Sequence, residues 1–302
     1  MEALVDLRHL KTQEIQLSFC NSLEVIVNDA IGQPNIDLDI ELEIYDRIFR
    51  HIVPRTCLDI GANIGSHTVF FSSRAKQVYS FEPNPFIFPV LLRNIERHCA
   101  SGKAFSFGLS NHPEHNELHV PLWGNTGNAS FFPENTWGKS RAVRATLEAG
   151  DELCRRESIH DVDFIKIDTE GYEARVILGL EDTITQNQPL ICLEWTMPST
   201  RADFLDNRET FHWIFKGYTA FALGSPWNKP CYPGIKRIKR WIMKNALRMK
   251  RPPICLQPFS FTSSCEILYL VPERFSKLTA LFSFTPKTYQ PKPGNFSELF
   301  PM

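Results

Sequence analysis

A short stretch near residue 60 constrains the fold of this chain more than any other. An apolar segment, 56–60, passes through Asp59 and meets Gly61 and Gly65, and the residues Thr68-Val-Phe-Phe71 that follow are typical of a helix. Glycine permits a sharp turn and lets a ligand approach the backbone closely. Glu82 ends a second apolar segment, at the distance from Asp59 where an acid reaches a nucleotide ribose. The pattern predicts a nucleoside-binding βαβ unit.

The order of the glycines indicates which nucleoside is bound. Dinucleotide-binding folds require Gly-x-Gly-x-x-Gly, whereas Gly61-Ala62-Asn63-Ile64-Gly65 lacks the middle glycine. The carboxylate of Asp59 would repel a pyrophosphate but suits an ammonium group. S-adenosylmethionine carries an ammonium, a sulfonium and a ribose, and no phosphate. The sequence therefore favours S-adenosylmethionine, and an NAD enzyme or a non-catalytic nucleoside-binding protein is the alternative.

Four motifs in a fixed order carry a family resemblance. They are Asp59-Ile-Gly-Ala-Asn-Ile-Gly65, Phe81-Glu-Pro-Asn-Pro85, Asn125-Thr-Gly-Asn-Ala-Ser-Phe131 and Asp163-Phe-Ile-Lys-Ile-Asp-Thr-Glu-Gly-Tyr-Glu173. Together they resemble the FkbM family of S-adenosylmethionine-dependent methyltransferases, over roughly residues 55 to 200. The resemblance implies O-methylation of a hydroxyl group on a sugar, glycan or natural-product acceptor.

Alternating strands and helices predict an α/β fold, a Rossmann-like doubly wound and mostly parallel sheet of the class I methyltransferase type. Strands are expected at 56–60, 77–81, 104–107, 162–167, 189–193, 218–223 and 266–271, and helices at 39–52, 85–98, 171–180 and 201–216. Ligands of such sheets bind outside the carboxyl ends of the strands.

The chain is expected to form one main domain with appendages. A strand and helix extension occupies 1–54, the methyltransferase domain occupies 55–284, and a proline-rich tail occupies 285–302. Two insertions interrupt the domain, a β element at about 112–148 and a basic helical segment at about 225–262. The turn-rich residues 125–130 are expected to shape the acceptor pocket.

The predicted cofactor site gathers residues from three strand ends. Glu82 should accept hydrogen bonds from both ribose hydroxyls, because two carboxylate oxygens match a vicinal diol. Asp59 is assigned to the methionine end, directly or through water, and the adenine to the residues after the third strand. The predicted cofactor-binding residues are Asp59, Gly61, Asn63, Gly65, Glu82, Pro83, Leu109 and Ser110.

The predicted catalytic groups follow one apolar strand, 162–167. Asp168 is the first candidate for the base that accepts the acceptor proton, and Glu170 is the second. Lys166 needs a carboxylate partner because it lies inside the strand, which favours an ion pair over a catalytic lysine. No metal is assigned, although Asp168 and Glu194 on adjacent strand ends form an alternative Mg²⁺ site.

Charge is distributed unevenly along the chain. The net charge is −1, yet residues 210–265 contain no acid and carry ten Lys and Arg side chains. Within this segment 235–251 resembles a basic amphipathic helix, which predicts an anionic or lipid-linked acceptor and peripheral contact with an anionic membrane surface. A helix with a solvated basic face is the alternative. No signal peptide, transmembrane segment or nucleic-acid partner is indicated, so a cytoplasmic protein is expected, peripheral at most to the inner membrane face.

Overall fold

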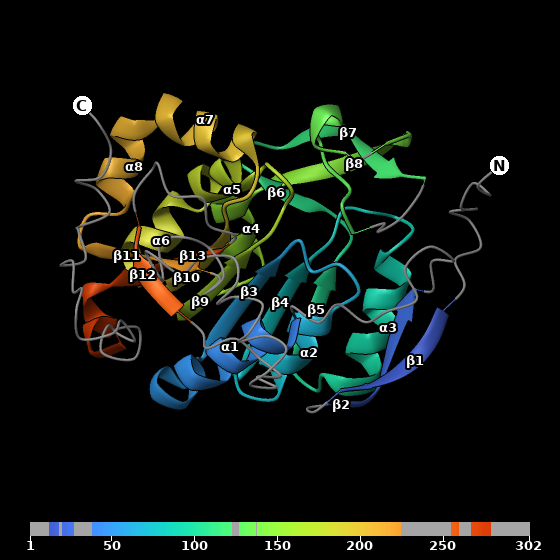
Figure 1. Cartoon of the computed structure of the whole chain (residues 1–302), viewed down its shortest axis with the longest axis horizontal. Coiled ribbons are helices and arrows are strands. Elements are labelled where there is room, and N and C mark those ends of the chain that lie inside the picture. Colours follow the sequence, from blue (N-terminus) through green and yellow to red (C-terminus); the bar gives the residue numbers. More distant parts are fainter. Residues whose placement is uncertain are drawn as a thin grey trace, which may run out of the picture.

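A computed structural model describes residues 12–17, 20–26, 38–122, 127–136, 138–224, 255–259 and 267–278. Its centre is an eight-stranded sheet with the order β12-β11-β13-β10-β9-β3-β4-β5 (Figure 1). The strands are β3 (Thr56–Ile60), β4 (Gln77–Phe81), β5 (Gly102–Phe105), β9 (Val162–Ile167), β10 (Leu190–Glu194), β11 (Tyr218–Gly224), β12 (Cys255–Pro258) and β13 (Ile267–Pro272).

The sheet has the mostly parallel topology that the sequence predicts. Strands β5, β4, β3, β9 and β10 pair in parallel, and β13 runs antiparallel between β10 and β11. The chain passes from β3 outward to β5 and returns to β9 on the other side of β3, so the strand order switches beside β3. The predicted fold class is confirmed.

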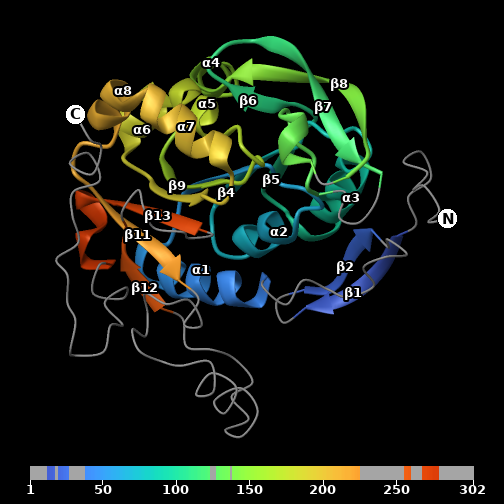
Figure 2. The same ribbon diagram turned by 45° about the horizontal axis from the view of Figure 1, so that its top comes forward.

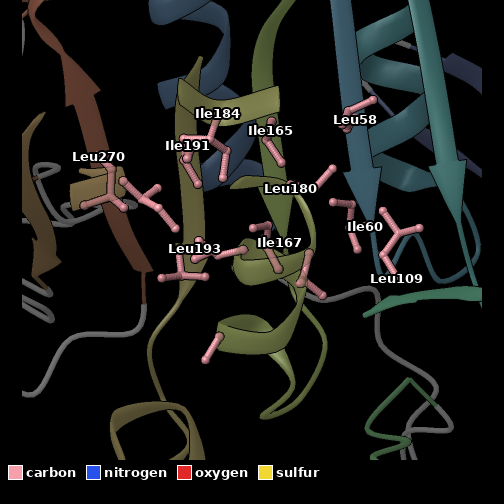
Figure 3. Close-up of a cluster of buried hydrophobic side chains, with 14 of the residues drawn as sticks. Leu58, Ile60, Leu109, Ile165, Ile167, Leu180, Ile184, Ile191, Leu193 and Leu270 are labelled. Atoms are coloured by element: carbon pink, nitrogen blue, oxygen red, sulfur yellow. The ribbon is translucent and has the colours of Figure 1, made fainter. Parts of the chain in front are cut away.

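Helices cover both faces of the sheet, because side chains of its central strands alternate between two apolar layers (Figure 2). Cys57 and Phe164 pack toward α1 (Leu38–Ile52) and α2 (Ser66–Ser72). Leu58 and Ile165 pack with helices of the opposite layer, where Leu180 and Ile184 meet β9 and β10 (Figure 3). That layer comprises α4 (Gly150–Arg156), α5 (Glu173–Gly179), α6 (Glu181–Asn187), α7 (Pro198–Asp206) and α8 (Arg208–Ile214).

The inserted β element forms a separate three-stranded sheet of order β6-β8-β7, beyond the carboxyl ends of β4 and β5 (Figure 1). Its strands are β6 (Gly108–Ser110), β7 (Glu114–Pro121) and β8 (Ser140–Ala149), and a short 3₁₀ helix, Pro133–Asn135, precedes β8. The element presses closely on α5, since a Cβ at Gly179 would lie 2.0 Å from the Ser110 carbonyl oxygen.

The N-terminal extension contains a hairpin ahead of α1. Strands β1 (Thr12–Leu17) and β2 (Cys20–Ile26) pair antiparallel, and β2 packs on α3 (Phe88–His98). At the other end of the described chain, a 3₁₀ segment, Glu273–Leu278, follows β13.

Several boundaries differ from those predicted. The third strand is Gly102–Phe105, and the helix expected at 201–216 is two helices, α7 and α8, separated at Asn207. Helix α3 begins at Phe88 because the Asn84 side chain accepts the Phe86 amide and the Asn84 carbonyl accepts the Ile87 and Phe88 amides, which forms a turn after Pro83. The sequence did not predict α4, α6, β6 or β12.

The basic helix predicted at 235–251 and the proline-rich tail predicted at 285–302 lie outside the described residues. So do Asn125 and Thr126 of the turn-rich segment 125–130. Across the part of the chain that the structure describes, no helix combines the length and apolarity needed to cross a bilayer.

Candidate active site

The predicted site residues come together where parallel strands end at one edge of the sheet. Register pairs Asp59 of β3 with Lys166 of β9, and Lys166 with Cys192 of β10. Backbone pairing continues past the strands, since the Gly61 amide donates to the Phe81 carbonyl and the Asp168 amide to the Ile60 carbonyl, both at 3.0 Å. The loops after β3, β4 and β9 are therefore held side by side.

The glycine loop adopts a backbone that few residues tolerate. Gly61, Asn63 and Gly65 have φ of 77°, 52° and 89°. A Cβ at Gly61 would lie 1.8 Å from the Asp168 carbonyl oxygen, so only glycine lets the two loops approach this closely. Asn63 takes a left-handed conformation in place of a glycine, as asparagine often does.

Glu82 is buried at the end of β4 and organises the loops on both sides of it. Its Oε2 accepts the Asn63 amide and its Oε1 accepts the Asn84 amide, each at 2.8 Å. Each carboxylate oxygen can accept two hydrogen bonds, so each retains one acceptor position for a ligand. Burial raises the pKa of Glu82 to about 7, against the lowering effect of the two amides. The arrangement suits the two hydroxyls of a ribose.

The residues predicted to lie on the adenine side are Pro83, which follows β4, and Leu109 and Ser110 of β6. Pro83 lies next to Gly108, where a Cβ would be 3.5 Å from Pro83 Cγ. Leu109 packs in the core, and the Ser110 side chain is buried and donates to Glu114 Oε1 at 3.1 Å. Contact between a ligand and Leu109 or Ser110 stays a prediction.

Asp59 and Lys166 lie beneath the rim as part of a buried ion network. The Asp59 carboxylate is fully buried and accepts the Thr68 hydroxyl at 2.6 Å. Lys166 Nζ lies 2.9 Å from Asp168 Oδ2 and 4.0 Å from Asp59 Oδ1. Burial lowers the pKa of Lys166, but the carboxylates of Asp168 and Asp59 outweigh burial and raise it above its ordinary value. Lys166 is thus a permanent cation that orients Asp168.

Three carboxyl groups converge above Lys166. Side-chain oxygens of Asp168, Glu170 and Glu194 all lie within 4.8 Å of one another. Burial favours a raised pKa for Asp168, but Lys166 and a contact with Glu194 lower it. Burial and the charge of Asp168 raise the pKa of Glu170 to about 8 and that of Glu194 well above its usual range. These shifts favour the ionised form of Asp168 and the protonated forms of Glu170 and Glu194.

Glu173, which the sequence analysis did not single out, fixes the turn that carries Asp168 and Glu170. It is fully buried at the start of α5. Its Oε1 accepts the amides of Thr169 and Gly171 at 3.0 Å, and its Oε2 accepts the Thr200 hydroxyl. An acid at a helix N-terminus is the signal that could have revealed this role.

The inserted β element also forms hydrogen bonds with the turn that carries Asp168 and Glu170. Ser130 Oγ and Asn135 Nδ2 donate to the Glu170 carbonyl at 2.7 and 2.9 Å. A Cβ at Gly171 would lie 2.3 Å from Asn135 Nδ2. Ser130 belongs to the segment expected to shape the acceptor pocket, whereas nothing in the sequence distinguished Asn135.

Several known proteins resemble this chain over part of its length. The family model of the methyltransferase FkbM domain matches residues 59–217. Hexuronic acid methyltransferase AglP of Haloferax volcanii is 29% identical over 133 residues, covering 42% of this chain and 50% of that protein. Methyltransferase 1 of Beauveria bassiana is 28% identical over 146 residues, covering 41% and 58%. The chain therefore spans about half the length of these relatives.

A solved structure, that of methyltransferase FkbM from Methylobacillus flagellatus, is similar at 16% identity and a TM-score of 0.42, covering 72% of this chain and 43% of that one. The family match extends over more than half of the sequence. It begins at Asp59 and includes the glycine loop, Glu82 and the turn after β9. The chain belongs to the FkbM methyltransferase family.

Proposed function

We propose that this protein transfers a methyl group from S-adenosylmethionine to a hydroxyl group of a sugar, glycan or natural-product acceptor. The observation that carries the proposal is Glu82, whose two oxygens each hold a loop amide and keep a free acceptor position. That pair of acceptors fits the vicinal hydroxyls of a ribose.

The remaining predicted residues fit the same cofactor. The glycine loop, with Gly61, Asn63 and Gly65, would face its methionine end, with Asp59 beneath the loop. Pro83, Leu109 and Ser110 would flank the adenine. When bound, S-adenosylmethionine supplies an electrophilic methyl group on a sulfonium, and the carboxylate of Asp168 favours a cation beside it. The same carboxylate disfavours the pyrophosphate of NAD.

The chain's own contribution to the reaction is proton transfer and orientation. Asp168 is kept ionised by Lys166, so it can accept the proton of the attacking hydroxyl. Glu170 and Glu194 have raised pKa values and would act as hydrogen-bond donors that orient the acceptor. Glu173, Ser130 and Asn135 hold the turn in place, which limits the motion of both acids.

A sugar acceptor is supported by one relative, a hexuronic acid methyltransferase. A bound Mg²⁺ is the alternative explanation of the acid cluster, because Asp168, Glu170 and Glu194 offer the hard oxygen ligands that this ion prefers. In that arrangement Asp168 would bind the metal instead of accepting the proton.

The direct test of the cofactor is calorimetry of the purified chain with S-adenosylmethionine, S-adenosylhomocysteine and NAD. We expect binding of the first two and none of NAD, and preferential NAD binding would refute the assignment. For the acceptor, glycans and lipids from cells with and without the gene are compared by mass spectrometry for a difference of one methyl group. Transfer that is abolished by a chelator and restored by Mg²⁺ would assign the acids to a metal.

A further inference from the structure

The N-terminal hairpin lies outside the range matched by the family, yet it reaches the glycine loop through Asn94. This residue of α3 is fully buried. Its Oδ1 accepts the Glu24 amide at 2.9 Å, and its Nδ2 donates to the carbonyls of Glu24 at 2.9 Å and Ile64 at 2.8 Å. Both donors of the amide are thus used, and one side chain connects β2 to the loop residue between Asn63 and Gly65.

Apolar packing joins the same two elements. Leu23 of β2 is fully buried in a cluster that contains Ala62 of the glycine loop together with Val69 and Leu91. Leu91 also lies directly beneath the loop, since a Cβ at Gly65 would come within 2.8 Å of Leu91 Cδ1. The loop therefore packs on a cluster to which the hairpin contributes Leu23 and the partly buried Val25.

The hairpin itself is anchored to α3 independently of the loop. Arg93 donates to both carboxylate oxygens of Glu24, through Nε at 2.9 Å and Nη2 at 2.8 Å. His98 Nε2 lies 2.9 Å from the Ser22 carbonyl oxygen, and Arg97 pairs with Glu14 at 2.6 Å. Figure 2 shows the hairpin as a separate layer beside α3. These bonds give Asn94 a fixed partner against which to hold the loop.

From these contacts we propose that the hairpin stabilises the binding-competent form of the cofactor site. Asn94 is the positioning residue, because it connects the hairpin to the glycine loop. Asn63 has a left-handed backbone, which costs free energy for a residue other than glycine, so bonds from outside the loop help it to persist. Asn94 holds the Ile64 carbonyl, only two peptide units after the Asn63 backbone amide that donates to Glu82, so it restrains the loop close to that bond. This inference rests on the proposed function, in which the glycine loop and Glu82 bind S-adenosylmethionine.

The coupling must act in both directions. If docking of the hairpin favours the binding-competent loop, cofactor binding must tighten the docking of the hairpin by the same factor. The Glu24 amide reports on this docking because its bond to Asn94 Oδ1 breaks when the hairpin detaches.

The test compares Asn94→Leu with Arg97→Ala. The first is nearly isosteric and removes the bonds to both Glu24 and Ile64, whereas the second removes an exposed ion pair of the hairpin that does not touch the loop. We expect the Kd for S-adenosylmethionine to rise roughly tenfold in Asn94→Leu and to stay unchanged in Arg97→Ala. Calorimetry is run at a temperature where circular dichroism shows each variant fully folded, so lost stability alone would leave Kd unchanged.

Hydrogen exchange of the wild-type chain provides a second measurement that does not depend on a variant folding. Saturating S-adenosylhomocysteine should slow exchange of the Glu24 amide by roughly the same factor of ten. Equal affinity in wild type and Asn94→Leu, or unchanged exchange at Glu24, would overturn the inference. If Asn94→Leu fails to fold, Leu23→Ala replaces it with the same expected weakening. Failure of the wild-type chain to bind the cofactor at all would instead refute the proposed function.

Discussion

Glu82 combines two tasks that require the same ionised carboxylate. It fixes the Asn63 and Asn84 amides, and in the proposed complex it also receives two ribose hydroxyls. Burial raises its pKa to about 7, so in the free protein it is protonated over part of the neutral range. A neutral carboxyl group offers fewer acceptor positions, and cofactor affinity should therefore depend on pH.

We expect Glu82→Gln to weaken S-adenosylhomocysteine binding by about 1.5–3 kcal/mol, the range for hydrogen bonds to a charged group. Wild-type affinity should also fall as the pH is lowered from 8 to 6, because Glu82 then changes from mostly ionised to mostly protonated. Calorimetry across this range measures both effects, with Glu96→Gln on the exposed side of α3 as the control. An unchanged Kd in folded Glu82→Gln would remove this residue from the site.

Asp168 should matter for turnover more than for cofactor binding. Asp168→Asn keeps the shape of the side chain but cannot take a proton, so we expect turnover to fall by about 10²–10⁴ with cofactor affinity largely retained. Release of S-adenosylhomocysteine in the presence of the acceptor measures the rate, and Asp206→Asn, an exposed acid of α7, is the matched control. Turnover within twofold of wild type would exclude Asp168 as the base.

At the scale of elements, the turns after β3 and β9 depend on each other. Asp168 donates its amide to Ile60 and places its carbonyl where a Cβ of residue 61 would lie. Glu173 and the inserted β element hold the other side of the second turn. The proposed catalytic acid, Asp168, therefore lies on a segment held by β3, α5 and a separate sheet, which restricts its position.

The close approach of these turns predicts different outcomes for two glycines with similar backbones. Gly61 and Gly217 have φ of 77° and 85°, but a Cβ at Gly217 meets nothing within 4 Å. Gly217→Ala should cost about 1–2 kcal/mol of unfolding free energy, the price of a left-handed alanine. Gly61→Ala adds a collision with backbone, so we expect a loss of more than about 4 kcal/mol. Urea unfolding compares them, and equal losses would contradict the tight contact.

At the scale of the whole molecule, the two ends of the parallel strands differ. The candidate site lies at their carboxyl ends, and Asp163 at the start of β9 stabilises their amino ends. This buried carboxylate accepts the Arg55 amide at 2.9 Å, Arg55 Nε at 3.0 Å and both terminal nitrogens of Arg274 at 3.0 Å. It thereby ties β3 and the 3₁₀ segment after β13 to the centre of the sheet.

Asp163→Asn should lower the unfolding free energy by about 1.5–3 kcal/mol while leaving cofactor affinity unchanged. Burial favours a raised pKa for Asp163, but Arg55 and Arg274 prevail and lower it. A lowered pKa stabilises the fold above the ordinary value of 3.8, and this contribution is lost as the pH falls through the folded-state pKa. The difference between wild type and variant should therefore shrink below about pH 4. A constant difference down to pH 2 would contradict this origin.

The sequence predicted strand bounds best where the strand has apolar neighbours on both faces of the sheet. Strands 56–60, 77–81 and 162–167 were predicted with the bounds that the structure has, because their apolar runs end at an acid or a turn. Strand β6 is only Gly108–Ser110 and pairs with β8, which begins 30 residues after it ends. Three residues carry no periodicity, so only the long-range pairing defines this strand.

The sequence by itself determined the order of the glycine loop, Glu82 and Asp168, because the sharp turn and the strand ends are local requirements of the backbone. Tertiary structure alone decided the direction in which the pKa of each acid shifts. Glu170 and Asp168 are two residues apart in one motif, yet Lys166 lowers the pKa of Asp168, and burial together with that carboxylate raises the pKa of Glu170 to about 8. Likewise, Asn94 contacts Glu24 across 70 positions of the chain. Burial and charge act through space, and one-dimensional spacing does not contain those distances.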